Sequence, residues 1–114
     1  MKASSEGGVM THLSDAQLRR WYCKFNEDLW ADQLPKDTVL VWQPVRGDCM
    51  AETWKLPDGR WQIAMSPSIS GFKRVAKLTL LHEMCHVARG RAWHGKAFQV
   101  EALRMMSAGG IKYF

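Results

Sequence analysis

The residues best suited to chemistry lie together in residues 80–86, which read LLHEMCH. His82 and His86 are four positions apart, so on a helix both imidazoles stand on one face and can reach the same metal ion. Glu83 lies one step further round the helix, beside the metal, where it can take a proton from an attacking water. The spacing therefore predicts a helical zinc site with Glu83 as the catalytic base.

The segment that carries this motif is apolar on nearly every side, which is typical of a buried helix. Its apolar members are Val75, Ala76, Leu78, Leu80, Leu81, Met84, Val87 and Ala88. Two histidines and a glutamate buried without partners would be strongly unfavourable, and a bound metal removes that conflict. The competing interpretation is a pair of core histidines that hydrogen bonds satisfy.

A catalytic zinc site needs a third protein ligand. On an unbroken helix, residue 94 would lie about 12 Å beyond His86 along the axis. However, Gly90 is well placed to end the helix in a left-handed conformation, so the chain can turn back. We therefore expect one catalytic Zn²⁺ held by His82, His86 and His94, with Glu101 on the following helix as the alternative third ligand.

The remaining histidine and the cysteines carry weaker signals. His12 lies in a small, polar segment, and we expect it to be inert. The chain has three cysteines, Cys23, Cys49 and Cys85, and no two of them form a CxxC pair. Neither a disulfide framework nor a cysteine-based zinc ribbon is therefore predicted. Cys85 lies inside the motif, where a small buried apolar role is expected rather than a ligand or nucleophile.

Local signals place these residues on an α+β fold. Ser14 and Gln17 form a capping-box pattern ahead of a helix predicted at about 15–31. A β-rich segment at 38–42 and a hairpin of 50–55 with 60–65, around the turn 56–59, predict a three-stranded sheet. The active-site helix is expected at 72–88 and a last helix at 96–107. With 114 residues, the chain is predicted to be a flexible tail (1–12) and one domain (13–114).

Composition predicts a protein of the cytoplasm, because the start lacks the apolar core of a secretory signal and no apolar stretch approaches membrane-spanning length. We expect a monomer without membrane contact. The six tryptophans are expected mainly in core or capping positions. Those near the hairpin and the site are alternatively candidates for a substrate groove or base stacking, namely Trp54, Trp61 and Trp93.

The positive charge is concentrated in the second half of the chain. Residues 1–59 carry seven Lys and Arg against nine Asp and Glu, whereas residues 60–114 carry nine against two. Such an excess favours an anionic partner such as DNA, although a merely solvated basic rim is an equal alternative. The basic residues that bracket the predicted metal helix are Lys73, Arg74, Lys77, Arg89, Arg91 and Lys96.

Several segments together resemble the SprT-like domain, the metallopeptidase domain that Spartan shares, over about residues 15–107. Residues 18–35, with Phe25-Asn26 and Leu34-Pro35, are similar to that family's opening helix and its following Leu-Pro. Residues 61–66 resemble the strand ahead of the active-site helix. Residues 81–86 and the stretch 94–98, HGKAF, match the family's HExxH and its later His-Gly-x-x-Phe.

The resemblance implies a zincin-like fold, zinc on His82, His86 and His94, and Glu83 as catalytic base. For the Spartan branch it also implies cleavage of proteins crosslinked to DNA. Many relatives carry a zinc ribbon or other DNA-binding segments after the catalytic domain. Residues up to Phe114 contain neither, so a DNA role is expected to rest on the basic surface of the domain.

The leading hypothesis is a zinc-dependent endopeptidase that acts on a protein or peptide substrate. An extended substrate is expected to add to the edge of the sheet beside residues 61–65. Tyr22, Tyr113 and an arginine near His94 are the candidates for stabilising the oxyanion. The rivals are a nucleic-acid-binding module with a structural zinc, against which Glu83 argues, and an inactive protein-interaction domain.

Overall fold

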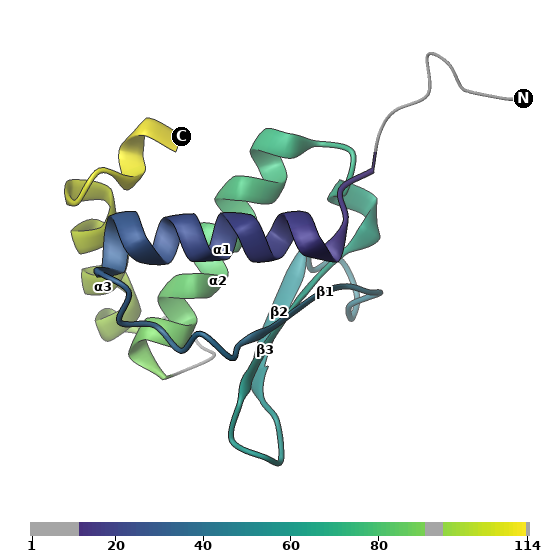
Figure 1. The fold of residues 1–114 in the computed structure, drawn as a ribbon, viewed down its shortest axis with the longest axis horizontal. Helices are drawn as coiled ribbons and strands as arrows, with labels where there is room; N and C mark the ends of the chain where they lie inside the picture. Colours follow the sequence, from purple (N-terminus) through teal and green to yellow (C-terminus); the bar gives the residue numbers. More distant parts are fainter. Residues whose placement is uncertain (1–11, 91–94, 114) are drawn as a thin grey trace, which may run out of the picture.

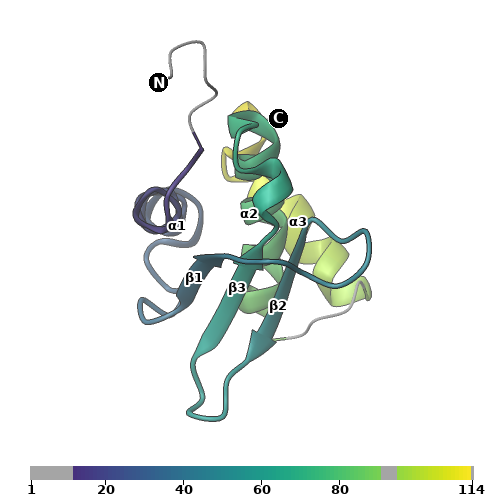
Figure 2. The ribbon, with the colours of Figure 1, turned by 90° about the vertical axis from the view of Figure 1, so that its right-hand side faces the viewer.

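A small sheet with helices packed against it forms the framework of the chain (Figures 1 and 2). The computed structural model describes residues 12–90 and 95–113. Within them lie three α-helices, three strands and two 3-10 turns. In chain order they are α1 (Asp15–Trp30), β1 (Val39–Trp42), β2 (Ala51–Lys55), β3 (Trp61–Met65), η1 (Pro67–Ile69), α2 (Lys73–Arg89), α3 (Lys96–Ser107) and η2 (Gly110–Tyr113).

Each helix and strand predicted from the sequence is present, with ends that coincide or differ by one residue. Local signals explain this agreement. The side chain of Ser14 caps α1 by accepting a hydrogen bond from the Gln17 amide at 3.1 Å. The predicted capping box is only half formed, because the Gln17 side chain accepts a hydrogen bond from Arg20 instead.

The order of strands in the sheet is β1-β3-β2, and this corrects one prediction. β3 pairs in parallel with β1 and antiparallel with β2, so it is the central strand. The expected docking of a substrate beside residues 61–65 is therefore wrong, since both sides of β3 are already paired. Hairpin signals identify which strands are joined by a turn, but they do not reveal that β1 adds to the far side of β3.

The helices enclose the core against one face of this sheet. α1 packs on β1, and α2 packs on β2 and β3 as well as on α1 and α3. Leu40, Ile63 and Thr53 lie side by side in register and are all buried. Trp21 and Trp30 are buried in the core as expected, and Trp42 and Trp61 pack against it. Trp54 is half-buried, while Trp93 lies outside the described residues.

A buried asparagine shapes the chain after α1. The Asn26 side chain accepts a hydrogen bond from the Leu34 amide at 3.0 Å and donates one to the Leu34 carbonyl at 3.1 Å. Ala31 and Asp32 between them adopt left-handed conformations, with φ of 52° and 63°. The asparagine thus holds a tight reversal that directs the chain from the end of α1 back toward β1.

The predicted tail of residues 1–12 lies outside the described residues except for its last member. His12 is within 2.6 Å of the Ser70 hydroxyl, and the next residue, Leu13, donates its amide to the Ser70 carbonyl. This places His12 against the η1 turn. None of the helices in the described part of the chain is both long and apolar enough to cross a membrane.

Candidate metal centre

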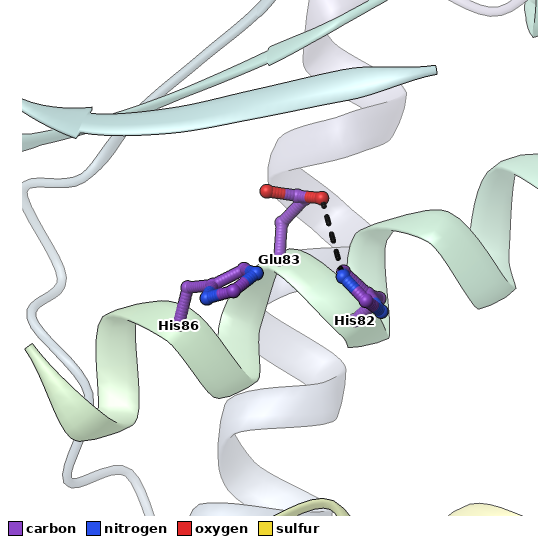
Figure 3. A group of neighbouring side chains, drawn as sticks. All are labelled: His82, Glu83 and His86. Carbon is purple, nitrogen blue, oxygen red and sulfur yellow. Dashed lines mark ion pairs between the residues drawn. The ribbon is translucent and has the colours of Figure 1, made fainter. Parts of the chain in front are cut away.

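The helix α2 presents His82, Glu83 and His86 as one cluster (Figure 3). Gly90 caps the helix after its last residue, and its φ of 66° is the left-handed conformation predicted for the break. His82 and His86 are one turn apart, with ring centroids separated by 5.1 Å. Each of the three side chains offers one ligand atom, and these atoms all lie within 4.8 Å of one another.

Burial across the cluster is uneven. Glu83 and His86 are buried at 7% and 4% exposure, whereas the His82 side chain is 43% exposed. The expectation of a helix buried on nearly every side is therefore wrong for one stripe, since Val75 is also exposed and Leu78 is half-buried. The sheet and the other helices cover the rest of α2, and the open stripe gives solvent and ligands access to His82.

Glu83 points from α2 toward the sheet, where Thr53 of the strand β2 donates a hydrogen bond to it at 2.5 Å. The other carboxylate oxygen of Glu83 lies 4.0 Å from Nε2 of His82. Burial raises the pKa of Glu83 above its ordinary value, the Thr53 hydrogen bond lowers it in part, and the nearby charge of Glu52 raises it further. A carboxyl group whose pKa is moved toward neutrality is suited to accepting and returning a proton.

Phe98 of the helix α3 lies against both imidazoles. Its ring centroid is 4.9 Å from that of His82 and 4.5 Å from that of His86, and its plane is tilted by only 30° from that of His86. Phe98 is also partly buried against the core. Its contact with the two histidines could not be predicted, because it depends on how α3 packs on α2.

The donor set fits a zinc ion. Nitrogen ligands lie about 2.0–2.1 Å from zinc, so two nitrogens on one ion must be within about 4 Å of each other. Ligand atoms within 4.8 Å of one another on adjacent helical turns reach that arrangement by small side-chain rotations. Imidazole nitrogens suit zinc and other transition metals, whereas magnesium and calcium favour sites made of oxygen ligands alone.

The two candidates for the third ligand differ in what the structure describes. His94 lies outside the described residues, so its role stays a prediction. Glu101 is buried and already occupied, because its carboxylate accepts a hydrogen bond from Trp30 Nε1 at 2.6 Å and pairs with Arg104 at 2.9 Å. Within the described residues, the side chains close enough together to share a metal ion are His82, Glu83 and His86, and Glu101 is not among them.

Two further predictions concern side chains near α2 and α1. Cys85 is fully buried, as expected, and burial raises the pKa of its thiol to about 12, so it is a poor nucleophile. The Tyr22 hydroxyl, one candidate for the oxyanion, is instead held by the Pro35 carbonyl at 2.6 Å and by Thr38 at 2.9 Å. The Tyr113 side chain and Arg91 are not among the described parts of the chain.

The predicted basic residues divide between the two ends of α2. Lys73, Arg74 and Lys77 lie in its first two turns, whereas Arg89 ends the helix and Lys96 begins α3. Lys112, which the sequence analysis did not single out, joins the first group, and these four side chains line a cavity of about 410 Å³. Lys77 also lies over the ring of Trp21, 5.4 Å from its centroid.

The profile of one protein family, described as the SprT-like family, matches residues 18–113. The chain belongs to the SprT-like family. The match includes most of α1, the sheet, the cluster on α2 and the helix α3, so it covers every described residue of the candidate site. Membership of the SprT-like family is consistent with a domain of the zinc metallopeptidase type. No curated protein and no solved structure matches the chain significantly.

Proposed function

We propose that this SprT-like protein is a zinc-dependent endopeptidase. The observation that carries the proposal is the environment of Glu83. Its carboxylate is buried, oriented by Thr53 and placed beside two imidazoles that fit a zinc ion. A structural metal site has no use for an unliganded carboxylate in this position, whereas metal-assisted hydrolysis needs a general base beside the attacking water, and this carboxylate can supply it.

When bound, the zinc ion supplies Lewis acidity that polarises the scissile carbonyl and makes water a better nucleophile. Glu83 accepts the proton that this water loses as it attacks the carbonyl carbon. The carboxyl group then donates the proton to the nitrogen of the leaving amine as the carbon–nitrogen bond breaks. The raised pKa of Glu83 supports both steps, because the energies of its two protonation states are brought closer together.

The strand β2 is the best support for an extended substrate. No described strand pairs with its outer side, and its Thr53 contacts the catalytic carboxylate. A peptide that adds to this edge gains main-chain hydrogen bonds and passes close to Glu83. This proposal replaces the docking site first expected at β3.

A zincin-like arrangement with His94 as the third ligand is part of the proposal. The left-handed end of α2 at Gly90 supports it, because it ends the helix four residues after His86. The helix α3, which begins at Lys96, also packs against α2, so residues soon after Gly90 in the sequence lie close to this helix again. His94→Ala is expected to lose zinc, while Glu101→Gln is expected to retain it.

The decisive test is proteolysis of a mixture of unfolded proteins by the zinc-loaded protein, with Glu83→Gln as the matched variant. We expect cleavage by the wild type, none by Glu83→Gln, and one equivalent of zinc in both by elemental analysis. Retention of zinc by the variant separates loss of the catalytic base from loss of the metal. Equal cleavage by both proteins, or none by either, would contradict the proposal.

We also propose that DNA-associated proteins are among the substrates. The cavity formed by Lys73, Arg74, Lys77 and Lys112 supports this, since basic side chains bind the phosphate backbone through electrostatic attraction. We expect single-stranded DNA to bind with strong salt dependence and to accelerate cleavage of a DNA-binding protein. The variant Lys73→Glu with Arg74→Glu is expected to lose this acceleration but keep the basal rate. Acceleration that survives in this variant would place DNA binding elsewhere.

A further inference from the structure

A shallow cavity adjoins the catalytic cluster on its open side. It has a volume of about 340 Å³ and is lined by Cys49, Met50, Leu78, Thr79, His82 and Glu83. Ligand-binding pockets generally enclose about 300–1,000 Å³, so a cavity at the lower limit suits one side chain rather than a whole small molecule. Because Glu83 and His82 form part of its wall, whatever fills it lies next to the reacting bond.

The lining of the cavity favours an apolar occupant. Met50 is 50% exposed, and the half-buried Leu78 lines the same cavity. The carboxylate of Glu83 at one end disfavours an acidic group, and Glu52 adds negative charge nearby. A leucine, methionine or phenylalanine side chain covers Met50 and Leu78 and removes their surface from water.

The position of the cavity along β2 determines which part of a substrate reaches it. Cys49 and Met50 immediately precede β2, whereas Thr53, which contacts Glu83, lies near the middle of the strand. The cavity therefore extends from Glu83 toward the beginning of β2. A peptide added antiparallel to β2, the more stable pairing, runs in the opposite direction to the strand. Its residues after the scissile bond then lie over the cavity.

On this basis, and resting on the proposed peptidase function, we infer that the cavity binds an apolar side chain of the residue directly after the cleaved bond. Met50 and Leu78 are then residues that determine specificity. In a closed pocket, one buried methylene group changes the ratio of kcat/KM between two substrates about tenfold or more. The cavity is open to solvent, so we expect the whole leucine side chain to be favoured over glycine by about tenfold.

The test is cleavage of a peptide mixture randomised around its centre, with cut sites identified by mass spectrometry. We expect Leu, Met and Phe to exceed Gly and Asp by about tenfold after the cut. Met50→Glu is expected to shift this preference toward Lys and Arg, a gain that simple unfolding does not produce. The matched control is Val75→Glu, which places the same charge on an exposed position of α2 outside the cavity and is expected to keep the apolar preference. No preference at this position, or a preference on the other side of the cut, overturns the inference.

A binding measurement separates failure of the cavity from failure of the peptidase. The zinc-loaded Glu83→Gln protein is titrated with labelled hexapeptides that differ only in a central Leu or Gly, and binding is followed by fluorescence anisotropy. We expect the Leu peptide to bind about tenfold more tightly, and Met50→Glu in the same background to abolish the difference. If this difference in binding is observed although the wild type cleaves no peptide, the inference about the cavity is supported and the proposed peptidase function is contradicted. Equal binding of the two peptides overturns the cavity whatever the cleavage result.

Discussion

At the scale of single residues, the most informative contact is the one between Thr53 and Glu83. Thr53 is buried on the edge strand and donates its hydroxyl to the carboxylate at 2.5 Å. This hydrogen bond fixes one oxygen of Glu83 and leaves the other 4.0 Å from His82. A base held in this way needs little reorganisation before it accepts a proton, which is how positioning lowers a reaction barrier.

The first prediction concerns Thr53→Val, which removes the hydroxyl and preserves the shape of the side chain. The hydrogen bond lowers the pKa of Glu83, so its loss raises that pKa further. Because Glu83 must be ionised to act as a base, the acidic limb of the rate profile is expected to move to higher pH. We also expect kcat to fall roughly ten- to a hundredfold.

Profiles of kcat/KM against pH for the wild type, Thr53→Val and Thr53→Ser check this prediction. Thr53→Ser keeps the hydroxyl, so it is expected to restore both the rate and the position of the acidic limb. An acidic limb that does not move in Thr53→Val would show that the hydroxyl has no influence on Glu83.

A second prediction at this scale concerns the cysteines. Cys23 and Cys49 are exposed, whereas Cys85 is fully buried and its thiol pKa is raised to about 12. The thiolate is the reactive form, so iodoacetamide at pH 8 is expected to modify Cys23 and Cys49 and leave Cys85 intact. Peptide mass mapping checks this, with urea-unfolded protein as the control in which all three react. Rapid modification of Cys85 in the folded protein would show that α2 opens readily.

At the scale of elements, each functional side chain depends on a neighbouring helix or strand. The helix α3 supplies Phe98, whose ring lies against both imidazoles of α2. Such a contact restricts the rotation of the two rings and favours the orientations in which both reach one metal. Hydrogen-bonding groups that orient metal ligands typically contribute ten- to a hundredfold to metal affinity, and we expect an aromatic contact that fixes the same rings to contribute at the lower end of this range.

The third prediction follows from this contact. Phe98→Ala is expected to weaken zinc binding by roughly tenfold, measured by competition with a chromophoric chelator. Val100→Ala is the matched control, because Val100 is on the same helix and 57% exposed. Equal zinc affinity in Phe98→Ala and the wild type would limit Phe98 to packing.

The fourth prediction concerns the turn that joins α1 to β1. Asn26→Ala leaves the buried amide and carbonyl of Leu34 without their partner, and each buried polar group left unpaired costs about 1–3 kcal/mol. We expect the free energy of unfolding to fall by roughly 2–4 kcal/mol in a urea titration. Gln33→Ala, in the same turn but exposed, is expected to change it by less than about 0.5 kcal/mol.

The elements also show what the sequence could and could not predict. Helix ends were predictable because their signals are local: the Ser14 hydroxyl caps α1, and Gly90 takes a left-handed φ after α2. The HExxH spacing likewise brings His82 and His86 together on any helix. The central place of β3, the role of Thr53 and the stacking of Phe98 depend on which elements pack together. Residues far apart in sequence make these contacts, so no local sequence pattern predicts them.

At the scale of the whole molecule, the fully buried core residues and the candidate metal ligands are different residues. The core consists of apolar side chains from α1, α2, α3 and the sheet, with Leu18, Ile63 and Leu80 completely buried. The imidazoles lie at one side of α2, and the His82 side chain is 43% exposed. A domain with its own apolar core does not depend on a metal for folding, in contrast to small zinc-stabilised modules.

The fifth prediction is that removal of zinc abolishes activity without unfolding the protein. After dialysis against a chelator, we expect an unchanged far-ultraviolet circular dichroism spectrum and a single cooperative thermal transition. Zinc at a hundred times its dissociation constant stabilises a protein by about 2.7 kcal/mol, so the transition is expected on the order of 10 °C lower without it. Activity is expected to return when zinc is added.

This experiment also discriminates between a catalytic and a structural zinc. If the zinc were structural, as in a nucleic-acid-binding module, its removal would unfold the chain, because the ion would replace core contacts. Here the side chains that hold α1, α2 and the sheet together are apolar and distinct from the cluster of His82, Glu83 and His86. His86→Ala is the matched variant, and we expect it to be folded and inactive like the chelated protein. Added zinc is expected neither to restore its activity nor to raise its thermal transition temperature. Loss of the helical signal on chelation would instead favour the structural role and remove the main support for the peptidase.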